Sequence, residues 1–247
     1  MEDKKKEKLF MRDFFRKAGK AIYDYELIEP GDRILVGVSG GKDSLALLEV
    51  LALRARDPKQ NYTVVAAHIA VENVAYEVDG EYVRQFCEQL GVEFIHRTIA
   101  TAVKEDSGKP VCFVCSWNRR KTLFGIAKEY GCNKLALGHH RDDAIETLLM
   151  SLFYEGRFHT FHPKTYLSRT GITAIRPLCY LPEYHVKHMV EELNLPVVKS
   201  PCPANGETKR QEMKELMQAL RKRYPDAPDR FLHALQSDKQ YDLWQKE

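Results

Sequence analysis

The chain has 247 residues, of which 44% are hydrophobic and 30% are charged, and its formal net charge is +3. This length suits one large α/β domain with helical additions, and no apolar run approaches the ~20 residues that a membrane-spanning helix needs. The first residues are basic but lack the apolar segment of a signal peptide. We therefore expect a cytoplasmic protein without a membrane anchor, whose charge permits RNA binding without requiring it.

Predicted helices and strands alternate along most of the chain. An amphipathic helix is expected over 7–28, where apolar residues recur at helical spacing. Short apolar runs further on are typical of strands buried on both faces. Strands are predicted over 34–38, 63–69, 92–96, 134–137 and 172–175, and further helices over 45–51, 79–90, 116–130, 142–154 and 182–193. This order predicts a Rossmann-like α/β fold with a doubly wound, mainly parallel sheet.

The two ends of the chain are predicted to be helical additions to this sheet. From about residue 203 the pattern becomes helical, with helices expected over 207–223 and 229–236. We expect three parts: an N-terminal helical segment over 1–30, an α/β domain over 31–202 and a C-terminal helical appendage over 203–247. The amphipathic N-terminal helix could pack in a homodimer.

The strongest chemical signal lies between the first buried strand and the next helix, in the run Ser39, Gly40, Gly41, Lys42, Asp43 and Ser44. Glycines let backbone amides approach an anion closely, and the new helix directs its positive end to the same place. Lys42 adds a positive charge, and the serines add hydroxyl donors. Asp43 would bind magnesium or set the shape of the loop. The run therefore predicts a phosphate-binding loop.

Two other phosphate-binding motifs do not fit this loop. A Walker motif would need glycine at position 36, which is Val36, and Ser or Thr after Lys42, which is followed by Asp43. The dinucleotide fingerprint Gly-x-Gly-x-x-Gly is absent as well. A purely conformational Gly-Gly turn would not require the polar side chains that surround Gly40 and Gly41.

A second polar cluster follows the predicted strand that ends at Leu137, in the run Gly138, His139, His140, Arg141, Asp142 and Asp143. Carboxyl ends of strands in a doubly wound sheet gather at one edge, so this run can face the phosphate loop. His140, Asp142 and Asp143 could serve acid–base chemistry, bind magnesium or balance phosphate charge. Helix capping is the alternative role of the aspartates, and one residue could do both.

Cysteines provide a third candidate site. Cys112 and Cys115 form a Cys-x-x-Cys pair in an expected loop before a helix, and Cys202 lies far downstream. Three converging thiolates would suit a metal ion or an iron–sulfur cluster with one open position, whereas a redox pair remains the alternative. The remaining cysteines are expected to be small buried residues: Cys87, Cys132 and Cys179.

Taken in order, these motifs resemble the tRNA 2-thiocytidine synthetases of the PP-loop ATP-pyrophosphatase superfamily, over nearly the whole chain. The Ser-Gly-Gly-Lys-Asp-Ser run after a hydrophobic strand resembles the PP-loop. The other matching segments are Lys20-Ala21-Ile22, the run 28–33, Arg119-Arg120 after the cysteine pair, the run 137–143, Phe153-Tyr154-x-Gly156, the run 175–178 and Pro201-Cys202.

The resemblance implies an ATP-dependent tRNA sulfurtransferase with an adenine nucleotide alpha hydrolase-like fold. ATP with Mg²⁺ would adenylate the C2 oxygen of an anticodon-loop cytidine, expected at position 32, and sulfur would then displace AMP. The implied catalytic residues are Asp43, His140, Asp142 and Asp143, and the implied nucleotide-binding residues are Ser39, Gly40, Gly41, Lys42, Asp43, Ser44, His68, Ile69 and Gly138. His68 and Ile69 would lie near the adenine.

The same resemblance implies that Cys112, Cys115 and Cys202 hold a 4Fe–4S cluster whose open iron carries the sulfur. A cysteine desulfurase or another donor would supply that sulfur. Family members usually have a second Cys-x-x-Cys where this chain has Asn205 in the last position. If three cysteines suffice to hold the cluster, Asn205 removes nothing essential.

Other functions use parts of the same pattern. Lysidine synthetases share the adenylation step but would leave the cysteines without a role. Thiouridine synthetases with terminal zinc fingers need paired Cys-x-x-Cys motifs near both ends. A nucleotide- or metal-binding regulator without catalysis is disfavoured, because both polar runs are intact.

Overall fold

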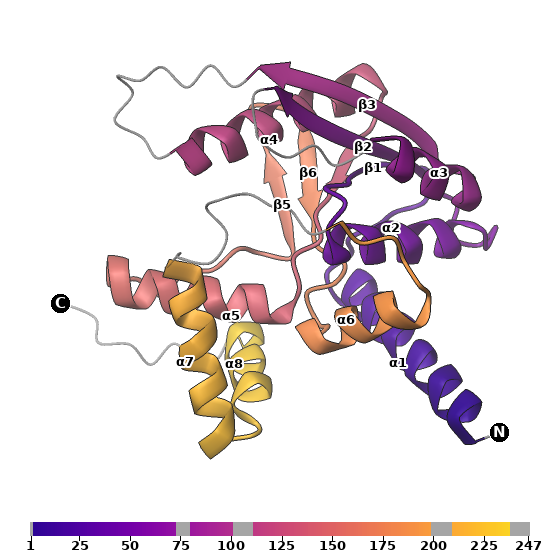
Figure 1. Cartoon of the computed structure of the whole chain (residues 1–247). Coiled ribbons are helices and arrows are strands. Elements are labelled where there is room, and N and C mark those ends of the chain that lie inside the picture. Colours follow the sequence, from indigo (N-terminus) through magenta and orange to yellow (C-terminus); the bar gives the residue numbers. More distant parts are fainter. Residues whose placement is uncertain (1, 73–79, 101–110, 199–208, 238–247) are drawn as a thin grey trace. The chain divides into compact units, whose positions relative to one another are not determined.

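The computed structural model describes residues 2–72, 80–100, 111–198 and 209–237 (Figure 1). The chain divides into two compact units. Residues 1–140 and 162–205 form the first, which we call the sheet unit, and residues 141–161 and 206–247 form the second, which we call the helical unit. The expected boundaries at 30 and 202 stay a prediction.

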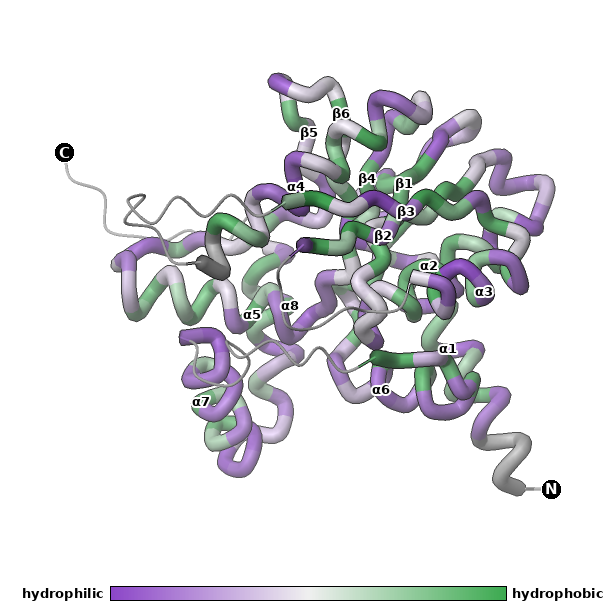
Figure 2. The backbone as a smooth tube through the Cα atoms, turned by 45° about the horizontal axis from the view of Figure 1, so that its top comes forward, coloured by the Kyte–Doolittle hydropathy of each residue, from purple (hydrophilic) through white to green (hydrophobic). Residues whose placement is uncertain are grey.

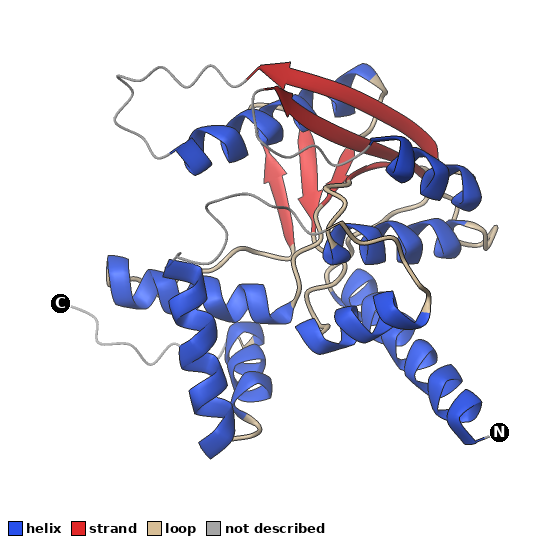
Figure 3. Ribbon diagram, viewed as in Figure 1, coloured by secondary structure: helices blue, strands red, loops and turns tan. Residues whose placement is uncertain are grey.

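One six-stranded sheet organises the sheet unit, with the strand order β3-β2-β1-β4-β6-β5. Its strands are drawn in red in Figure 3. The strands are β1 (Arg33–Gly37), β2 (Thr63–Glu72), β3 (Glu93–Ala100), β4 (Lys134–Ala136), β5 (Lys164–Leu167) and β6 (Ile172–Ile175). Every neighbouring pair is parallel except β5 and β6, which are antiparallel. The predicted doubly wound, mainly parallel sheet is confirmed.

Apolar side chains cover both faces of this sheet, as expected for parallel strands. Along β1, Ile34 and Val36 join one buried cluster, whereas Leu35 joins the other. The backbone coloured by hydropathy shows the same concentration of apolar residues along the inner strands (Figure 2). Helices α1 (Glu2–Asp24), α2 (Lys42–Ala55), α3 (Gly80–Leu90) and α6 (Glu183–Glu192) contribute to the first cluster, and α4 (Val111–Glu129) contributes to the second.

Two local predictions differ from the structure. The cysteine pair was expected in a loop, but α4 begins at Val111 and includes both positions. Pro110 immediately precedes this helix, and a proline near the first turn is compatible with a helix start. Strand β5 was not predicted, because its sequence has no apolar run and it is an edge strand held by β6 alone.

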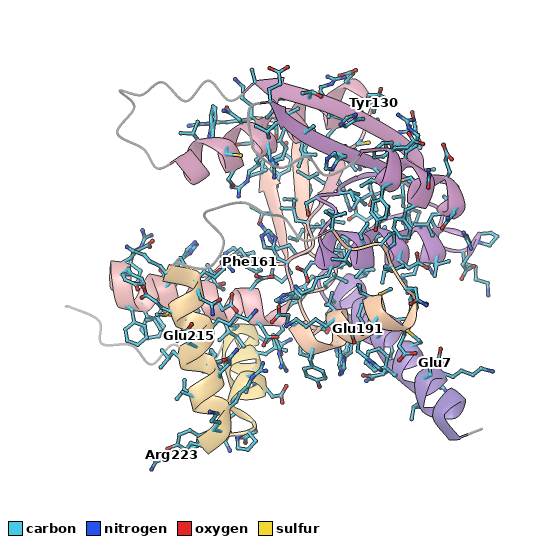
Figure 4. The ribbon with its side chains drawn as sticks, viewed as in Figure 1. Glu7, Tyr130, Phe161, Glu191, Glu215 and Arg223 are labelled. Carbon is cyan, nitrogen blue, oxygen red and sulfur yellow. The ribbon has the colours of Figure 1, made fainter. Side chains whose placement is uncertain are left out.

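The helical unit contains α5 (Arg141–Met150), the π-helical turn η2 (Ser151–Glu155), α7 (Lys209–Arg223) and α8 (Ala227–Gln236). Its apolar centre joins Ile145 and Leu149 of α5 to Met213 and Met217 of α7. Helix α7 carries Glu215 along its length and ends at Arg223 (Figure 4). In the part of the chain that the structure describes, no helix is long and apolar enough to cross a membrane.

A buried ion pair joins the beginnings of β1 and β4. Asp32 and Lys134 are 4% and 3% exposed, and the Lys134 Nζ lies 2.7 Å from the Asp32 Oδ2. The Asn133 amide donates to the Asp32 Oδ1 at 2.7 Å, and the Glu29 N–H donates to its Oδ2 at 2.6 Å. These contacts fix where the two central strands start relative to each other.

We expect Asp32→Ala to lower the free energy of unfolding by about 3–5 kcal/mol, because it leaves the Lys134 ammonium buried without its carboxylate. Urea denaturation followed by circular dichroism measures the loss. Asp32→Asn is the matched variant, since it keeps hydrogen-bonding capacity and removes only the charge. A loss below about 1 kcal/mol in Asp32→Ala would show that water replaces the carboxylate at no great cost.

Candidate active site

The strand order places two loops at one edge of the sheet. Strand β1 lies between β2 and β4, so the connections that follow β1 and β4 leave on opposite sides of the point where the strand order reverses. Ligands of open α/β sheets bind at such a point, beyond the carboxyl ends of the strands. The predicted phosphate loop, 39–44, follows β1, and Gly138 and His140 follow β4.

Hydrogen bonds within the phosphate loop hold its shape. The Ser39 N–H donates to the Ser44 Oγ at 3.1 Å, and the Ser44 hydroxyl donates to the Gly41 carbonyl at 2.9 Å. Gly40 has a φ of 80°, a conformation that favours glycine. The first turn of α2 begins at Lys42, and its N–H groups lack partners within the helix. This loop can therefore present backbone amides to an anion.

Gly138 lies against the backbone of the phosphate loop. A Cβ atom at this position would stand 2.9 Å from both the carbonyl carbon and the oxygen of Asp43, and 3.2 Å from the Ser44 nitrogen. No side chain fits in that space without moving the backbone of the loop. Glycine is therefore needed at position 138 because the phosphate-loop backbone lies so close to it, and not because of an unusual φ.

Charged side chains surround the start of α2. The Lys42 Nζ lies 2.8 Å from Asp43 and 3.3 Å from Glu183, which begins α6. Burial opposes the charged ammonium, but the two carboxylates outweigh burial and raise the pKa of Lys42. Asp43 also lies 3.7 Å from the Nε2 of the buried His140. Glu183 could not be predicted as a contact of Lys42, because it lies far along the chain at an ordinary helix start.

His68 lies in the middle of β2, beside Val38, which leads from β1 into the phosphate loop. Its Nδ1 lies 2.7 Å from the Val38 carbonyl oxygen, to which the neutral ring donates. Burial is the main cause that lowers the pKa of His68, and the charges of His96 and Arg119 act in the same direction. A neutral imidazole near a nucleotide can make hydrogen bonds without adding charge.

Ile69 lies on the opposite face of the sheet from His68, since adjacent strand residues alternate. It packs in the buried cluster that includes residues of α4. Its predicted place near an adenine therefore depends on its backbone rather than on its side chain.

Asp142 and Asp143 belong to the helical unit, where arginines contact both carboxylates. The Arg221 Nη2 lies 2.5 Å from Asp142, and the Arg210 Nη1 lies 3.0 Å from Asp143. Arg210 also lies 3.3 Å from Glu146. These contacts join the start of α5 to α7, which is a structural role that the sequence did not reveal. Catalytic roles of Asp142 and Asp143 stay a prediction.

The predicted cluster ligands are only partly described. Cys202 lies outside the described residues. Positions 112 and 115 are three apart on α4, so they share one side of the helix, and Cys115 is a free, half-buried cysteine. The side chain of Cys112, like Cys202, lies outside the part of the chain that the structure describes. Within residues 2–72, 80–100, 111–198 and 209–237, no group of three His, Cys, Asp or Glu residues is arranged to hold a metal ion.

The other cysteines are buried, as predicted: Cys87, Cys132 and Cys179. Burial raises the pKa of both the Cys87 and the Cys179 thiols to about 12. These two thiols stay protonated at neutral pH and are poor nucleophiles and poor metal ligands.

The family model of the PP-loop domain matches residues 11–220. The tRNA-cytidine(32) 2-sulfurtransferase of Pelobacter propionicus is 38% identical over 224 residues, which cover 88% of this chain and 82% of the relative. That of Geotalea uraniireducens is 37% identical over 236 residues, which cover 93% and 92% of the two chains. This chain belongs to the PP-loop family of tRNA-cytidine(32) 2-sulfurtransferases.

A solved structure agrees with this assignment to the PP-loop sulfurtransferases. The U34-tRNA thiolase NcsA from Methanococcus maripaludis, solved with its 4Fe–4S cluster, has a TM-score of 0.74 and 26% sequence identity to this chain. The match covers 91% of this chain and 77% of the thiolase. The resemblance stated from the sequence motifs is confirmed.

We expect Gly138→Ala to weaken ATP binding by at least about tenfold, because the added methyl group displaces the Asp43 backbone and distorts the loop. Isothermal titration calorimetry measures the affinity. Gly125→Ala is the matched control, since a Cβ on that helical glycine meets nothing within 4 Å. Unchanged affinity in Gly138→Ala would mean that the two loops separate without loss of binding.

We expect Glu183→Gln to strengthen ATP binding severalfold in the absence of Mg²⁺. A carboxylate about 4 Å from an anion opposes it by roughly 1–4 kcal/mol in surface-like surroundings. Glu191→Gln removes a charge from the same helix and is the control. Weaker binding in Glu183→Gln would show instead that Glu183 holds Lys42 in its binding position.

Proposed function

We propose that this enzyme uses ATP to replace the C2 oxygen of cytidine 32 in tRNA with sulfur. The observation that carries the proposal is the combination of a formed PP-loop with a cysteine pair on one side of α4. The relatives are tRNA-cytidine(32) 2-sulfurtransferases, which supports cytidine 32 of tRNA as the substrate.

The phosphate loop binds the triphosphate of ATP in this proposal. Amides at the start of α2 and the Lys42 ammonium neutralise phosphate charge, while Asp43 helps to hold Mg²⁺. His68 stays neutral and lies near the adenosine. Attack by the cytidine C2 oxygen on the α-phosphate releases pyrophosphate and leaves an adenylated base.

Residues that follow β4 contribute to the adenylation step in this proposal. His140, 3.7 Å from Asp43, orients that carboxylate during adenylation. Asp142 and Asp143 are further candidate Mg²⁺ ligands, and a bound ion would compete with Arg221 and Arg210 for their oxygens.

Cys112, Cys115 and Cys202 are the proposed ligands of a 4Fe–4S cluster. The cluster, when bound, offers an open iron for the sulfur that replaces the adenylated oxygen. Positions 112 and 115 suit this purpose because they share one side of α4, whereas the buried, protonated Cys87 and Cys179 do not suit it.

A sulfur donor such as a cysteine desulfurase completes the proposed reaction. We also propose a reducing, cytoplasmic location, where free thiols persist. Helix α1 is the candidate homodimer contact, because Leu9 on it is 66% exposed.

The proposal predicts that Cys115→Ser lowers 2-thiocytidine formation by more than about 100-fold, since loss of one of three thiolates removes the cluster. Nucleoside analysis of tRNA by mass spectrometry measures the product, and iron content measures the cluster. Cys179→Ser is the matched control and keeps both. Pyrophosphate release from ATP with tRNA is measured in parallel, because adenylation does not need Cys115.

Full 2-thiocytidine formation in Cys115→Ser would rule out the cluster mechanism. Release of pyrophosphate without any tRNA dependence in the wild-type enzyme would rule out tRNA as the adenylated substrate.

A further inference from the structure

A basic pocket lies on the sheet unit between α4 and the turn that joins β5 to β6. We call it the α4 pocket. Its volume is about 390 Å³, within the ~300–1,000 Å³ that ligand pockets occupy. Four cations and two aromatic rings line most of it: Arg120, Lys121, Lys128, Arg169, Trp117 and Phe124.

The charge of the α4 pocket is unbalanced. No carboxylate lines it, and among the described residues none of its four cations is in an ion pair. Glu129, the nearest acid along α4, is bound by Arg97 at 2.8 and 3.0 Å. Together with burial, the charge of Arg120 lowers the pKa of the neighbouring Arg176 to about 10. The pocket therefore attracts anions.

An exposed tryptophan gives the pocket a stacking surface. Trp117 is 54% exposed, which is uncommon for so large an apolar side chain, and the Lys121 Nζ lies 5.4 Å from the centre of its ring. Proteins bind single-stranded nucleic acids by stacking bases on such rings while nearby cations bind phosphates. A tryptophan flanked by cations that have no ion pair within the described part of the chain, on an apolar floor, matches this combination.

We propose that the α4 pocket binds an unpaired nucleotide of the tRNA substrate, with its base stacked on Trp117 and the adjacent phosphates at Arg120, Lys121 and Arg169. This inference rests on the proposed function. Trp117 follows Cys115 by two residues on the same helix, so the pocket lies within one helical turn of the cysteine pair along α4, although residues two apart face different sides of a helix. An anticodon loop supplies unpaired bases of the required kind.

Gly125 offers a way to change the pocket without disturbing the fold. It lines the pocket, and a Cβ added there meets nothing within 4 Å. Replacing glycine within a helix also removes a helix-destabilising residue. Gly125→Glu adds a negative charge, whereas Gly125→Gln adds a side chain of the same size without charge.

We expect Gly125→Glu to weaken tRNA binding by about tenfold or more, and to reduce the dependence of the affinity on salt concentration, because it repels a phosphate. Gly125→Gln should retain most of the affinity. Filter binding over a range of salt concentrations measures both. Gln85→Glu on the exposed surface of α3 adds the same net charge and should bind tRNA as the wild type does.

Tryptophan fluorescence tests the stacking directly. The chain has two tryptophans, Trp117 and Trp244, so Trp244→Phe leaves Trp117 as the only one. Addition of tRNA should quench its emission, and Gly125→Glu in the same background should shift the quenching to higher tRNA concentrations.

Wild-type affinity in Gly125→Glu together with unquenched Trp117 would overturn the proposal. Unchanged tRNA affinity with slower sulfur transfer from a protein donor would also overturn it, because the pocket would then bind that donor. If the wild-type enzyme itself bound no tRNA, the proposed function would fail, whereas loss of binding in the variant alone concerns the pocket. ATP binding measured without tRNA separates loss of the pocket from misfolding.

Discussion

The close approach of Gly138 to the Asp43 backbone is the constraint on which the nucleotide site depends. It exists because β1 and β4 are adjacent and parallel, so that the loops after them leave the sheet at the same edge. The buried Asp32–Lys134 pair fixes the opposite ends of the same two strands. One strand pairing, held at both ends, therefore sets the distance between the PP-loop and His140.

In the free PP-loop, the carboxylates of Asp43 and Glu183 already occupy the Lys42 ammonium. Lys42 contacts Asp43 and Glu183, so a phosphate entering the loop replaces interactions that already exist. Such competition lowers affinity for any anion that offers only one contact. A nucleotide that also engages the amides of α2 overcomes it. We therefore expect the loop to favour polyphosphates over single small anions.

The sequence predicted the parts of the fold that depend on local pattern. The buried strands, the phosphate loop and β6 follow from apolar runs and glycine placement, and they agree with the structure. Glu183 and the arginines that bind Asp142 and Asp143 could not be predicted. Their contacts join residues far apart along the chain, and an Arg or Glu on a helix surface has the same local pattern whether or not it has a distant partner. The edge strand β5 was not predicted for a related reason: its pairing with β6, rather than its own sequence pattern, makes it a strand.

Helix α4 links the features that the motifs present separately. Positions 112 and 115 share one side near its beginning, and Trp117 and Lys121 form the stacking surface of the α4 pocket further along. Arg119 lies between Trp117 and Lys121 in sequence, and its charge, after burial, is among the causes that lower the pKa of His68 beside the phosphate loop. The Nε of Arg119 is buried without a hydrogen-bond partner among the described residues. One helix therefore carries the cysteine pair, a cation that acts on His68, and the proposed RNA contact.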